Sequence, residues 1–306
     1  MNPINKVLIV GAGAVGAAVA SKIYDTFPSD VSVLAAGERF SRYKKNGFIL
    51  NGKRFDFPLA SPDDAIVADL IIVAVKSHNL SDAIATMKNK VGPTTIILSL
   101  LNGISSEEIL ADAFGKEKVL LAMILGIDAV RIGNDTRFSS SGKIFFGKEL
   151  NKGNAWSPEV RAVADFFDKT GVPYVVPENM TRSLWYKFMI NVGINQASAV
   201  LRAPYRVFQT IPEARSVMES GMREVIALSK ILGTGLEDAD LERWTDTLMA
   251  LGPEGVTSML QDVEAKRKTE VEIFSGTVIE LGKKAQLPTP VNELWFNLIR
   301  TIERNY

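Results

Sequence analysis

Three polar side chains recur at every fourth residue in an otherwise apolar stretch: Lys187, Asn191 and Asn195. Residues 185–195 are apolar nearly all round, so the helix that they predict should be buried. On that helix the three side chains would share one face at intervals of ~6 Å. A buried ammonium group and two buried amides are costly unless partners satisfy them. A polar ligand in a cleft would satisfy them, and hydrogen bonds between helices are the alternative.

Two further polar residues follow nearer the C-terminus. Ser258 opens the sequence SMLQ, which fits a capping box, and a helix N-terminus of this kind can also seat a carboxylate. Glu270 lies seven residues after Val263 and four before Phe274, so one helical stretch over residues 258–285 would place its carboxylate on or beside the apolar stripe. An unpaired carboxylate is rarely tolerated there, and a lysine in the same cleft would be its natural partner.

A glycine-rich loop near the N-terminus predicts a dinucleotide site. It has the pattern G-x-G-x-x-G and consists of Gly11, Ala12, Gly13, Ala14, Val15 and Gly16. Gly11 would allow a tight turn, Gly13 would let the backbone approach a pyrophosphate, and Gly16 would let helix and strand pack closely. The loop follows a predicted strand and opens a predicted helix, whose free N–H groups attract an anion. We therefore expect Gly11, Gly13, Ala14, Val15 and Gly16 to bind the cofactor, and a glycine turn without a ligand is the alternative.

The residues after the second predicted strand bear on the choice between NADP and NAD. An acidic residue that would hold the ribose hydroxyls is expected ~20 residues after the loop, but Ala36 stands there. Cationic side chains follow, namely Arg39, Arg42, Lys44 and Lys45. They favour a 2′-phosphate and hence NADP, and we expect Arg39 to contact the cofactor, whereas Glu38 keeps NAD possible. A solvated helix face is the alternative reading of this cluster.

The elements that must position these residues change character along the chain. In the first half, strands are expected at residues 7–10, 31–34, 70–75, 95–98 and 172–176, helices at 14–24 and 155–169, and hairpins or edge strands at 48–57 and 138–146. In the second half, long amphipathic stretches are expected at 181–201, 212–232, 238–251, 258–285 and 291–305. Alternating strands and helices predict an α/β, Rossmann-like doubly wound sheet. We expect this domain over residues 1–178 and an all-helical domain over 179–306.

Composition excludes several classes of function. The chain of 306 residues has no cysteine, which excludes disulfides and thiolate chemistry, and its one histidine, His78, argues against His-rich metal sites. We expect no metal. Lys+Arg and Asp+Glu both number 35, so there is no general basic field for nucleic acid or a membrane surface. Glycines interrupt the only stretch that could pass for a signal peptide, so we expect a cytoplasmic protein.

These motifs together resemble the ketopantoate reductase (2-dehydropantoate 2-reductase) family along essentially the whole chain. The landmarks are GAGAVG at 11–16, V-K at 75–76, L-N-G at 101–103, W-Y-K-x-x-x-N-x-x-x-N at 185–195, SMLQD at 258–262 and R-K-T-E at 267–270. The glycine loop is shared by many dehydrogenases, whereas the lysine–asparagine helix combined with SMLQD and T-E is far more specific.

The resemblance implies a reaction and a role for each matching residue. The reaction is reduction of ketopantoate to pantoate by hydride transfer from NADPH, in pantothenate and coenzyme A biosynthesis. Lys187 would be the general acid, and Glu270 would help to bind substrate and fix the charge pattern at the cofactor. Asn191, Asn195 and Ser258 would hold the substrate. Lys76 and Asn102 would lie at the cofactor edge of the cleft, where Asn102 would also contact substrate.

The family commonly has an arginine at the end of the second strand, where this chain has Ala36, so the choice of cofactor stays open. Two alternative functions and one possible partner remain to be considered. A reductase of another 2-oxo acid is the nearest alternative, because a fold does not determine a substrate. A dinucleotide-sensing regulator without turnover is the alternative from another class, although a sensor needs no proton donor. Apolar helices near the C-terminus make a homodimer possible.

Overall fold

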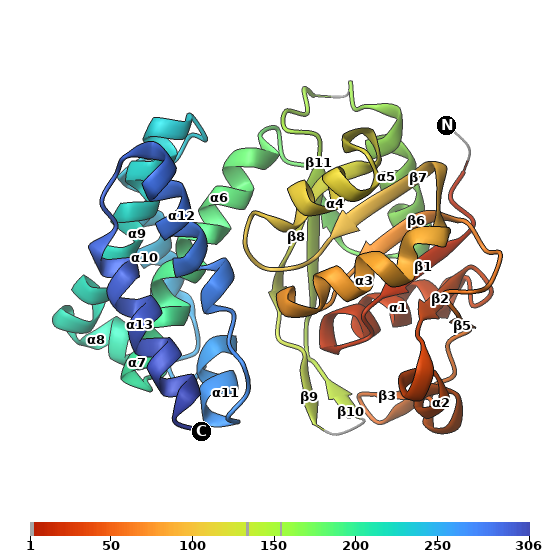
Figure 1. The fold of residues 1–306 in the computed structure, drawn as a ribbon, viewed down its shortest axis with the longest axis horizontal. Coiled ribbons are helices and arrows are strands. Elements are labelled where there is room, and N and C mark those ends of the chain that lie inside the picture. The colour runs from red at the N-terminus through yellow and green to blue at the C-terminus, as the bar shows by residue number, and fades with distance from the viewer. Residues whose placement is uncertain (1–2, 133–134, 154) are drawn as a thin grey trace. The chain divides into compact units, whose positions relative to one another are not determined.

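A computed structural model describes residues 3–132, 135–153 and 155–306 of the chain. The chain divides into two compact units. Unit 1 comprises Met1–Asn102 and Ser106–Met180, and unit 2 comprises Gly103–Ser105 and Thr181–Tyr306. Unit 1 is the red-to-green part of the ribbon in Figure 1, and unit 2 is mostly the cyan-to-blue part. The limits 1–178 and 179–306 stay a proposal for the functional domains.

Unit 1 is built on an eight-stranded sheet in the order β12-β11-β8-β7-β6-β1-β2-β5. Its strands are β1 (Val7–Val10), β2 (Val31–Leu34), β5 (Leu59–Ala60), β6 (Ala68–Val73), β7 (Val91–Ser99), β8 (Val119–Ile127), β11 (Ser141–Gly147) and β12 (Tyr174–Val175). All neighbours pair in parallel except β8 and β11, which are antiparallel. The chain places β2 on one side of β1 and then crosses to place β6 on the other, which is a topological switch point.

Helices cover both faces of this sheet, as a mostly parallel sheet requires. They are α1 (Ala14–Thr26), α2 (Gly37–Asn46), α3 (Leu80–Met87), α4 (Ser106–Phe114) and α5 (Pro158–Thr170). In β1, Val7 and Ile9 join the apolar cluster that includes residues of α1 and α5. Leu8 and Val10 join the cluster that includes residues of α3 and Leu110 of α4. The predicted fold class, a doubly wound domain followed by a helical one, is confirmed.

A second, smaller sheet completes unit 1, in the order β4-β3-β10-β9. Its strands are β3 (Phe48–Leu50), β4 (Lys53–Phe55), β9 (Val130–Ile132) and β10 (Asp135–Arg137). The strands β3 and β4 form the hairpin expected within residues 48–57. The expectation for residues 138–146 was wrong in part, because β11 is an interior strand between β8 and β12. The strand β8, which pairs with β11, was not among the predicted strands.

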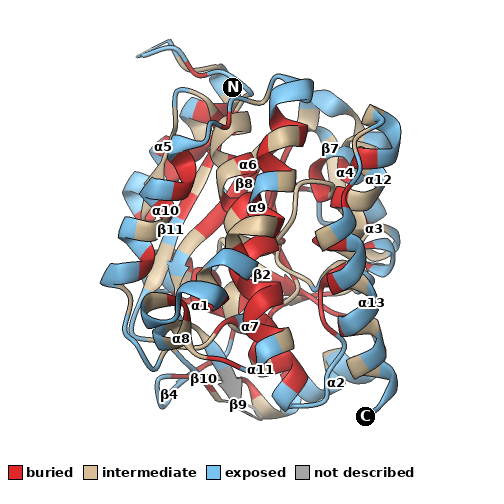
Figure 2. Cartoon of the chain, turned by 90° about the vertical axis from the view of Figure 1, so that its left-hand side faces the viewer, coloured by how far each residue is buried: buried red, intermediate tan, exposed pale blue. Residues whose placement is uncertain are grey.

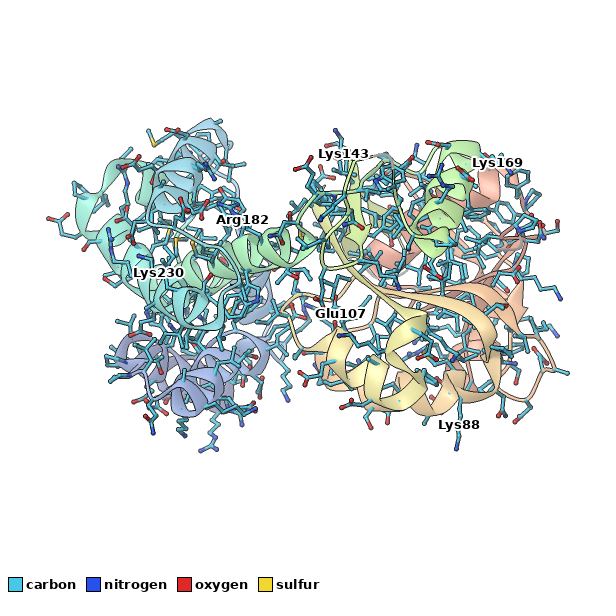
Figure 3. All side chains as sticks on the ribbon, turned by 90° about the horizontal axis from the view of Figure 1, so that it is seen from above. Lys88, Glu107, Lys143, Lys169, Arg182 and Lys230 are labelled. Carbon is cyan, nitrogen blue, oxygen red and sulfur yellow. The ribbon has the colours of Figure 1, made fainter. Side chains whose placement is uncertain are left out.

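Unit 2 is helical. Its helices are α6 (Met180–Ile190), α7 (Gln196–Leu201), α8 (Tyr205–Thr210), α9 (Pro212–Leu232), α10 (Ala239–Ala250), α11 (Ser258–Glu264), α12 (Ser275–Ala285) and α13 (Pro290–Arg304). A π-helical turn at Asn191–Asn195, called the π segment below, joins α6 to α7. Arg182 on α6, labelled in Figure 3, bonds the fully buried Asp240 at 2.7 Å and so ties α6 to α10. Figure 2 shows α7 largely in the colour of buried residues.

Short 3-10 helices lie at Ser77–Asn79, Lys88–Lys90, Lys116–Lys118 and Val271–Ile273. Within the described part of the chain, no helix combines the length and apolar character that crossing a membrane requires.

Candidate active site

The glycine loop leaves β1 and turns directly into α1. Gly11 has a φ of +97°, and a Cβ there would lie 2.8 Å from the Ala74 carbonyl group, so a side chain is excluded twice over. A Cβ at Gly16 would lie 2.1 Å from the Gly11 carbonyl oxygen, because the helix crosses the loop at very close range. These two glycines are therefore required by the protein itself.

Gly13 differs from both, because none of the described residues requires a glycine at this position. It is the N-cap of α1 with φ −73° and ψ −160°, a conformation open to any residue. A Cβ built there would meet no atom of the residues that the structure describes within 4 Å. The helix has no side-chain cap and no acidic residue in its first turn, and Ala14 and Val15 begin it. Open space above Gly13 beside uncapped N–H groups fits a pyrophosphate group.

Two of the expected residues share the edge of the sheet with this loop. In the register of the sheet, Val10 of β1 pairs with Val73 of β6, which pairs with Ser99 of β7. Lys76 and Asn102 each follow one of these pairing residues by three positions. The loops that carry them therefore leave the sheet at the same carboxyl edge as Gly11, where ligands of open α/β sheets bind.

A cavity of about 410 Å³ lies in unit 1, bounded by Gly11 and by the residues after β2. Its lining consists of Val10, Gly11, Leu34, Ala35, Ala36, Glu38, Arg39, Arg42, Val75, Asn79, Asp82, Ala83 and Thr86. The lining combines apolar residues with polar and charged ones, and the volume is in the range of small-molecule sites. The cavity continues from the glycine loop to Arg39, so it fits the adenosine half of a dinucleotide.

The charges around this cavity differ from those expected. Arg39 and Arg42 line it, as the sequence predicted, but Lys44 is not among the lining residues that the structure describes. Asp82, from the first turn of α3, lines it together with Glu38. Two guanidinium groups therefore stand against two carboxylates, whereas the sequence suggested more cations than carboxylates. This balance reduces the electrostatic advantage of a 2′-phosphate.

The polar stripe of unit 2 is buried, as expected. The exposed fractions of Lys187 and Asn195 are 8% and 7%, and Asn191 is half-buried. The Asn195 amide donates to Asn191 Oδ1 at 3.4 Å. Asn191 Nδ2 is buried and has no hydrogen-bond partner among the described residues. A buried donor left unsatisfied costs free energy, so Asn191 fits a position that a polar ligand completes.

The π segment alters the phase of the stripe. Eight residues of a regular α-helix advance about 80° beyond two full turns, so Asn195 would drift away from Lys187 around the axis. A π turn is wider, and four of its residues fall roughly 30° short of a full turn instead of about 40° beyond it. By this geometry, the π turn at Asn191–Asn195 would bring Asn195 back almost into line with Lys187. The sequence predicted a regular helix here, and that part of the prediction was wrong.

The position of Ser258 was also predicted incorrectly. The N-cap of α11 is Thr257, whose Oγ1 accepts from the Leu260 N–H at 3.2 Å, so Ser258 is the first helical residue rather than the cap. The side chain of Ser258 is exposed and does not cap the helix. The helix α11 packs against α7 and the π segment. Ser258 therefore begins a helix that lies beside the polar stripe.

Glu270 does not lie on a long helix, contrary to expectation. The chain leaves α11 after Glu264, Lys266 adopts a left-handed φ of +51°, and Arg267 bonds Asp262 at 2.9 Å. Glu270 precedes the 3-10 helix Val271–Ile273, and its exposed fraction is 5%. The expectation that its carboxylate is buried holds, but a loop positions it.

That loop is fixed by the last helix. Glu303 of α13 accepts from both the backbone N–H and the hydroxyl of Thr269, at 2.8 and 2.7 Å. Arg300 bonds the other Glu303 oxygen at 3.1 Å and also Glu272 at 2.8 Å. Thr269 directly precedes Glu270, so α13 holds the backbone that carries this carboxylate. The roles assigned to these residues stay predictions.

Sequence reasoning missed two residues of these sites. Asp82 enters the cavity from α3, about forty residues beyond the other charges, and only the sheet topology brings it there. Gln196 follows Asn195 and is fully buried. In the sequence, the one feature that could have indicated its role is a polar residue within a run of small residues that are expected to be buried. Neither belongs to a motif with characteristic spacing.

Two family models match the chain. The model for ketopantoate reductase PanE/ApbA matches residues 7–150, and the model for the C-terminal part of ketopantoate reductase PanE/ApbA matches residues 179–303. The 2-dehydropantoate 2-reductase of Aquifex aeolicus (strain VF5) is 26% identical over 313 residues, which cover 98% of this chain and 97% of that protein.

Solved structures of similar fold include a dehydrogenase with a different name. The ternary structure of D-mandelate dehydrogenase with NADH and anilino(oxo)acetate superposes with a TM-score of 0.88 at 21% identity, covering 98% of this chain and 99% of that one. A dimeric ketopantoate reductase from Staphylococcus aureus gives 0.83 at 20% identity, with the same coverage. At these identities the likeness shows the fold.

Proposed function

The chain belongs to the ketopantoate reductase family of oxidoreductases, and we propose that it reduces the C2 carbonyl of ketopantoate to the alcohol of pantoate with NADPH. The observation that carries this proposal is the buried stripe of Lys187, Asn191 and Asn195, with its unsatisfied donor at Asn191 Nδ2. A proton donor flanked by amides in an apolar helix suits a small carbonyl substrate with polar groups.

The cofactor would be held by unit 1. Gly11, Gly13 and Gly16 shape the loop, and the N–H groups at Ala14 and Val15 receive the pyrophosphate. Arg39 receives the 2′-phosphate at the rim of the cavity. Lys76 and Asn102 serve the part of the ligand nearer the reacting carbon.

A reduced nicotinamide, when bound, would supply the hydride that C2 of the substrate receives. Lys187 donates a proton from Nζ to the carbonyl oxygen, so the ketone gains one hydride and one proton and becomes a secondary alcohol. The same ammonium group stabilises the negative charge that develops on that oxygen. Asn191, Asn195 and Ser258 hold the carboxylate and hydroxyl of the substrate, with Asn102 as a further contact. Glu270 fixes the charge pattern around Lys187 and the cofactor.

The charged residues that line the cavity determine the preference between NADPH and NADH. Two arginines favour the 2′-phosphate, and Glu38 and Asp82 oppose it. We therefore propose a preference for NADPH that is modest, with NADH also accepted. The proposal includes a homodimer, in line with the dimeric Staphylococcus aureus relative, and a cytoplasmic enzyme.

A panel of 2-oxo acids tests the reaction. Oxidation of NADPH and NADH is followed at saturating cofactor with ketopantoate, pyruvate, 2-oxoisovalerate and phenylglyoxylate. We expect kcat/KM for ketopantoate to exceed that for each other acid at least ~10-fold, the scale of one well-used polar contact. Binding of a dinucleotide without turnover of any acid would favour a sensor and overturn the proposal.

A second candidate reaction rests on the D-mandelate dehydrogenase structure, whose fold agrees with this chain over nearly its whole length. Phenylglyoxylate is the 2-oxo acid that corresponds to mandelate. A higher kcat/KM for phenylglyoxylate than for ketopantoate, with NADH as the better cofactor, would favour this second candidate.

A further inference from the structure

The π segment is held by a side chain that makes a bond normally made by backbone. In an α-helix, the Val192 carbonyl would accept from the N–H of residue 196. Here the backbone N–H of Gln196 donates to the Gly193 carbonyl, and the side-chain amide of Gln196 donates to the Val192 carbonyl at 2.8 Å. Gln196 therefore supplies a donor at the point where π pairing disturbs the regular ladder.

Gln196 is itself held by a buried chain of polar groups. Its Oε1 accepts from the Ser275 hydroxyl at 2.7 Å and from the Ser275 N–H at 3.3 Å. Ser275 Oγ also lies 2.9 Å from Asn292 Oδ1, and its single proton serves one of the two oxygens at a time. Gln196, Ser275 and Asn292 are fully buried.

Glu224 on α9 completes this chain, which we call the Gln196 relay (Gln196, Ser275, Asn292 and Glu224). Glu224 Oε2 accepts from Asn292 Nδ2 at 2.7 Å. Its two oxygens also accept from the N–H groups of Val291 and Asn292, at 2.8 and 3.0 Å, in the first turn of α13. The relay thus connects the π segment to α12, α13 and α9.

We propose that Gln196 is a positioning residue for the substrate site. By holding the Val192 carbonyl, it keeps the π pairing that aligns Asn195 with Lys187. Loss of the Gln196 side chain would let the segment return to α-helical pairing, and Asn195 would rotate away from the face that carries Lys187. This inference rests on the proposed function of that face in binding a 2-oxo acid.

Gln196→Leu removes the side-chain hydrogen bonds to the Val192 carbonyl and to Ser275 at nearly constant volume. We expect KM for the preferred 2-oxo acid to rise at least ~10-fold. An asparagine amide that lies even ~1 Å away from its productive position holds the substrate poorly. The Kd for reduced cofactor should stay within about twofold, because unit 1 carries that site. Ser275→Ala is a smaller change. It leaves the Gln196–Val192 hydrogen bond but removes the Ser275 hydroxyl that donates to Gln196, so it should raise KM about threefold.

Ser198→Ala is the matched control. Ser198 is fully buried on the same helix and bonds the Ala203 carbonyl at 2.7 Å, outside the relay. It should lose comparable stability with KM within about twofold of wild type. An unchanged KM in Gln196→Leu and Ser275→Ala, or an equal rise in Ser198→Ala, would show that the relay is only structural.

Amide hydrogen exchange in the full chain tests the relay without activity. Exchange rates in peptides covering residues 190–198 should change at least ~10-fold in Gln196→Leu, because the N–H groups of the segment change their acceptors, and should change little in Ser198→Ala. If the wild type reduces no 2-oxo acid, the proposed function fails, and the exchange result alone supports or overturns the claim that Gln196 holds the π segment.

Discussion

Substituting Gly13 should separate cofactor binding from folding. A Cβ at this position meets no atom within 4 Å in the described part of the chain, and the backbone is in an extended conformation. Exchanging Gly for Ala at an N-cap costs roughly 0.5–1 kcal/mol. Restriction of the unfolded chain returns about 0.4–1 kcal/mol. The free energy of unfolding of Gly13→Ala should therefore stay within about 0.5 kcal/mol of wild type.

Cofactor binding should respond very differently. The added methyl group occupies the space through which a pyrophosphate would reach the N–H groups of α1. An anion at a helix N-terminus gains up to about 2 kcal/mol, which corresponds to a factor of roughly 30 in Kd. We expect Gly13→Ala to weaken NADPH binding by about that factor, and Gly13→Val to abolish measurable binding.

Gly16→Ala provides the matched contrast. Its Cβ would lie 2.1 Å from the Gly11 carbonyl oxygen, which belongs to the backbone and cannot move aside. We expect a loss of more than ~2 kcal/mol in the free energy of unfolding. Urea unfolding and fluorescence titration with NADPH measure the two quantities. A folded Gly13→Val protein with wild-type affinity would refute the placement of the pyrophosphate at this loop.

Four further predictions concern catalysis, substrate binding and cofactor choice. Lys187→Ala should lower kcat at least ~100-fold with an unchanged far-UV spectrum, since a general acid is lost; near-normal turnover would remove Lys187 as proton donor. Asn191→Leu removes the buried unsatisfied Nδ2. It should therefore leave the free energy of unfolding equal or higher while raising KM about tenfold; a clear loss of stability without a change in KM would contradict this. The double change Arg39→Ala with Arg42→Ala should erase most of the preference for NADPH in kcat/KM and leave NADH activity nearly unchanged. Asp82→Asn should raise the ratio of kcat/KM for NADPH to that for NADH about threefold, since a carboxylate that opposes the 2′-phosphate is neutralised; an unchanged ratio would place the 2′-phosphate away from Asp82.

The features that sequence predicted well are those whose causes are local. The glycine loop could be predicted because a turn, a ligand and a close packing contact each require glycine at a particular position. The helix expected at residues 212–232 begins at Pro212 and ends before Gly233. Alternation of buried strands and amphipathic helices indicated the doubly wound fold for the same reason.

The features that it missed depend on tertiary contacts. The same residues could form an α-helix or the π segment, and the buried bond from Gln196 belongs to the folded unit. The break before Glu270 uses Lys266 in a left-handed conformation, where glycine or asparagine would have signalled a turn. Asp82 reaches the cavity only because two parallel strands are neighbours.

The packing of α5 has a consequence for biosynthesis. Val160, Val163 and Phe167 of α5 share one apolar cluster with Ala17 and Ile23 of α1, although about 140 residues separate them in the chain. While the N-terminal half emerges from a ribosome, the face of the central sheet that α5 will cover stays partly exposed. Contacts between residues so far apart in the chain also form slowly. Nascent chains that end near residue 150 should therefore bind chaperones more strongly than chains that extend past α5.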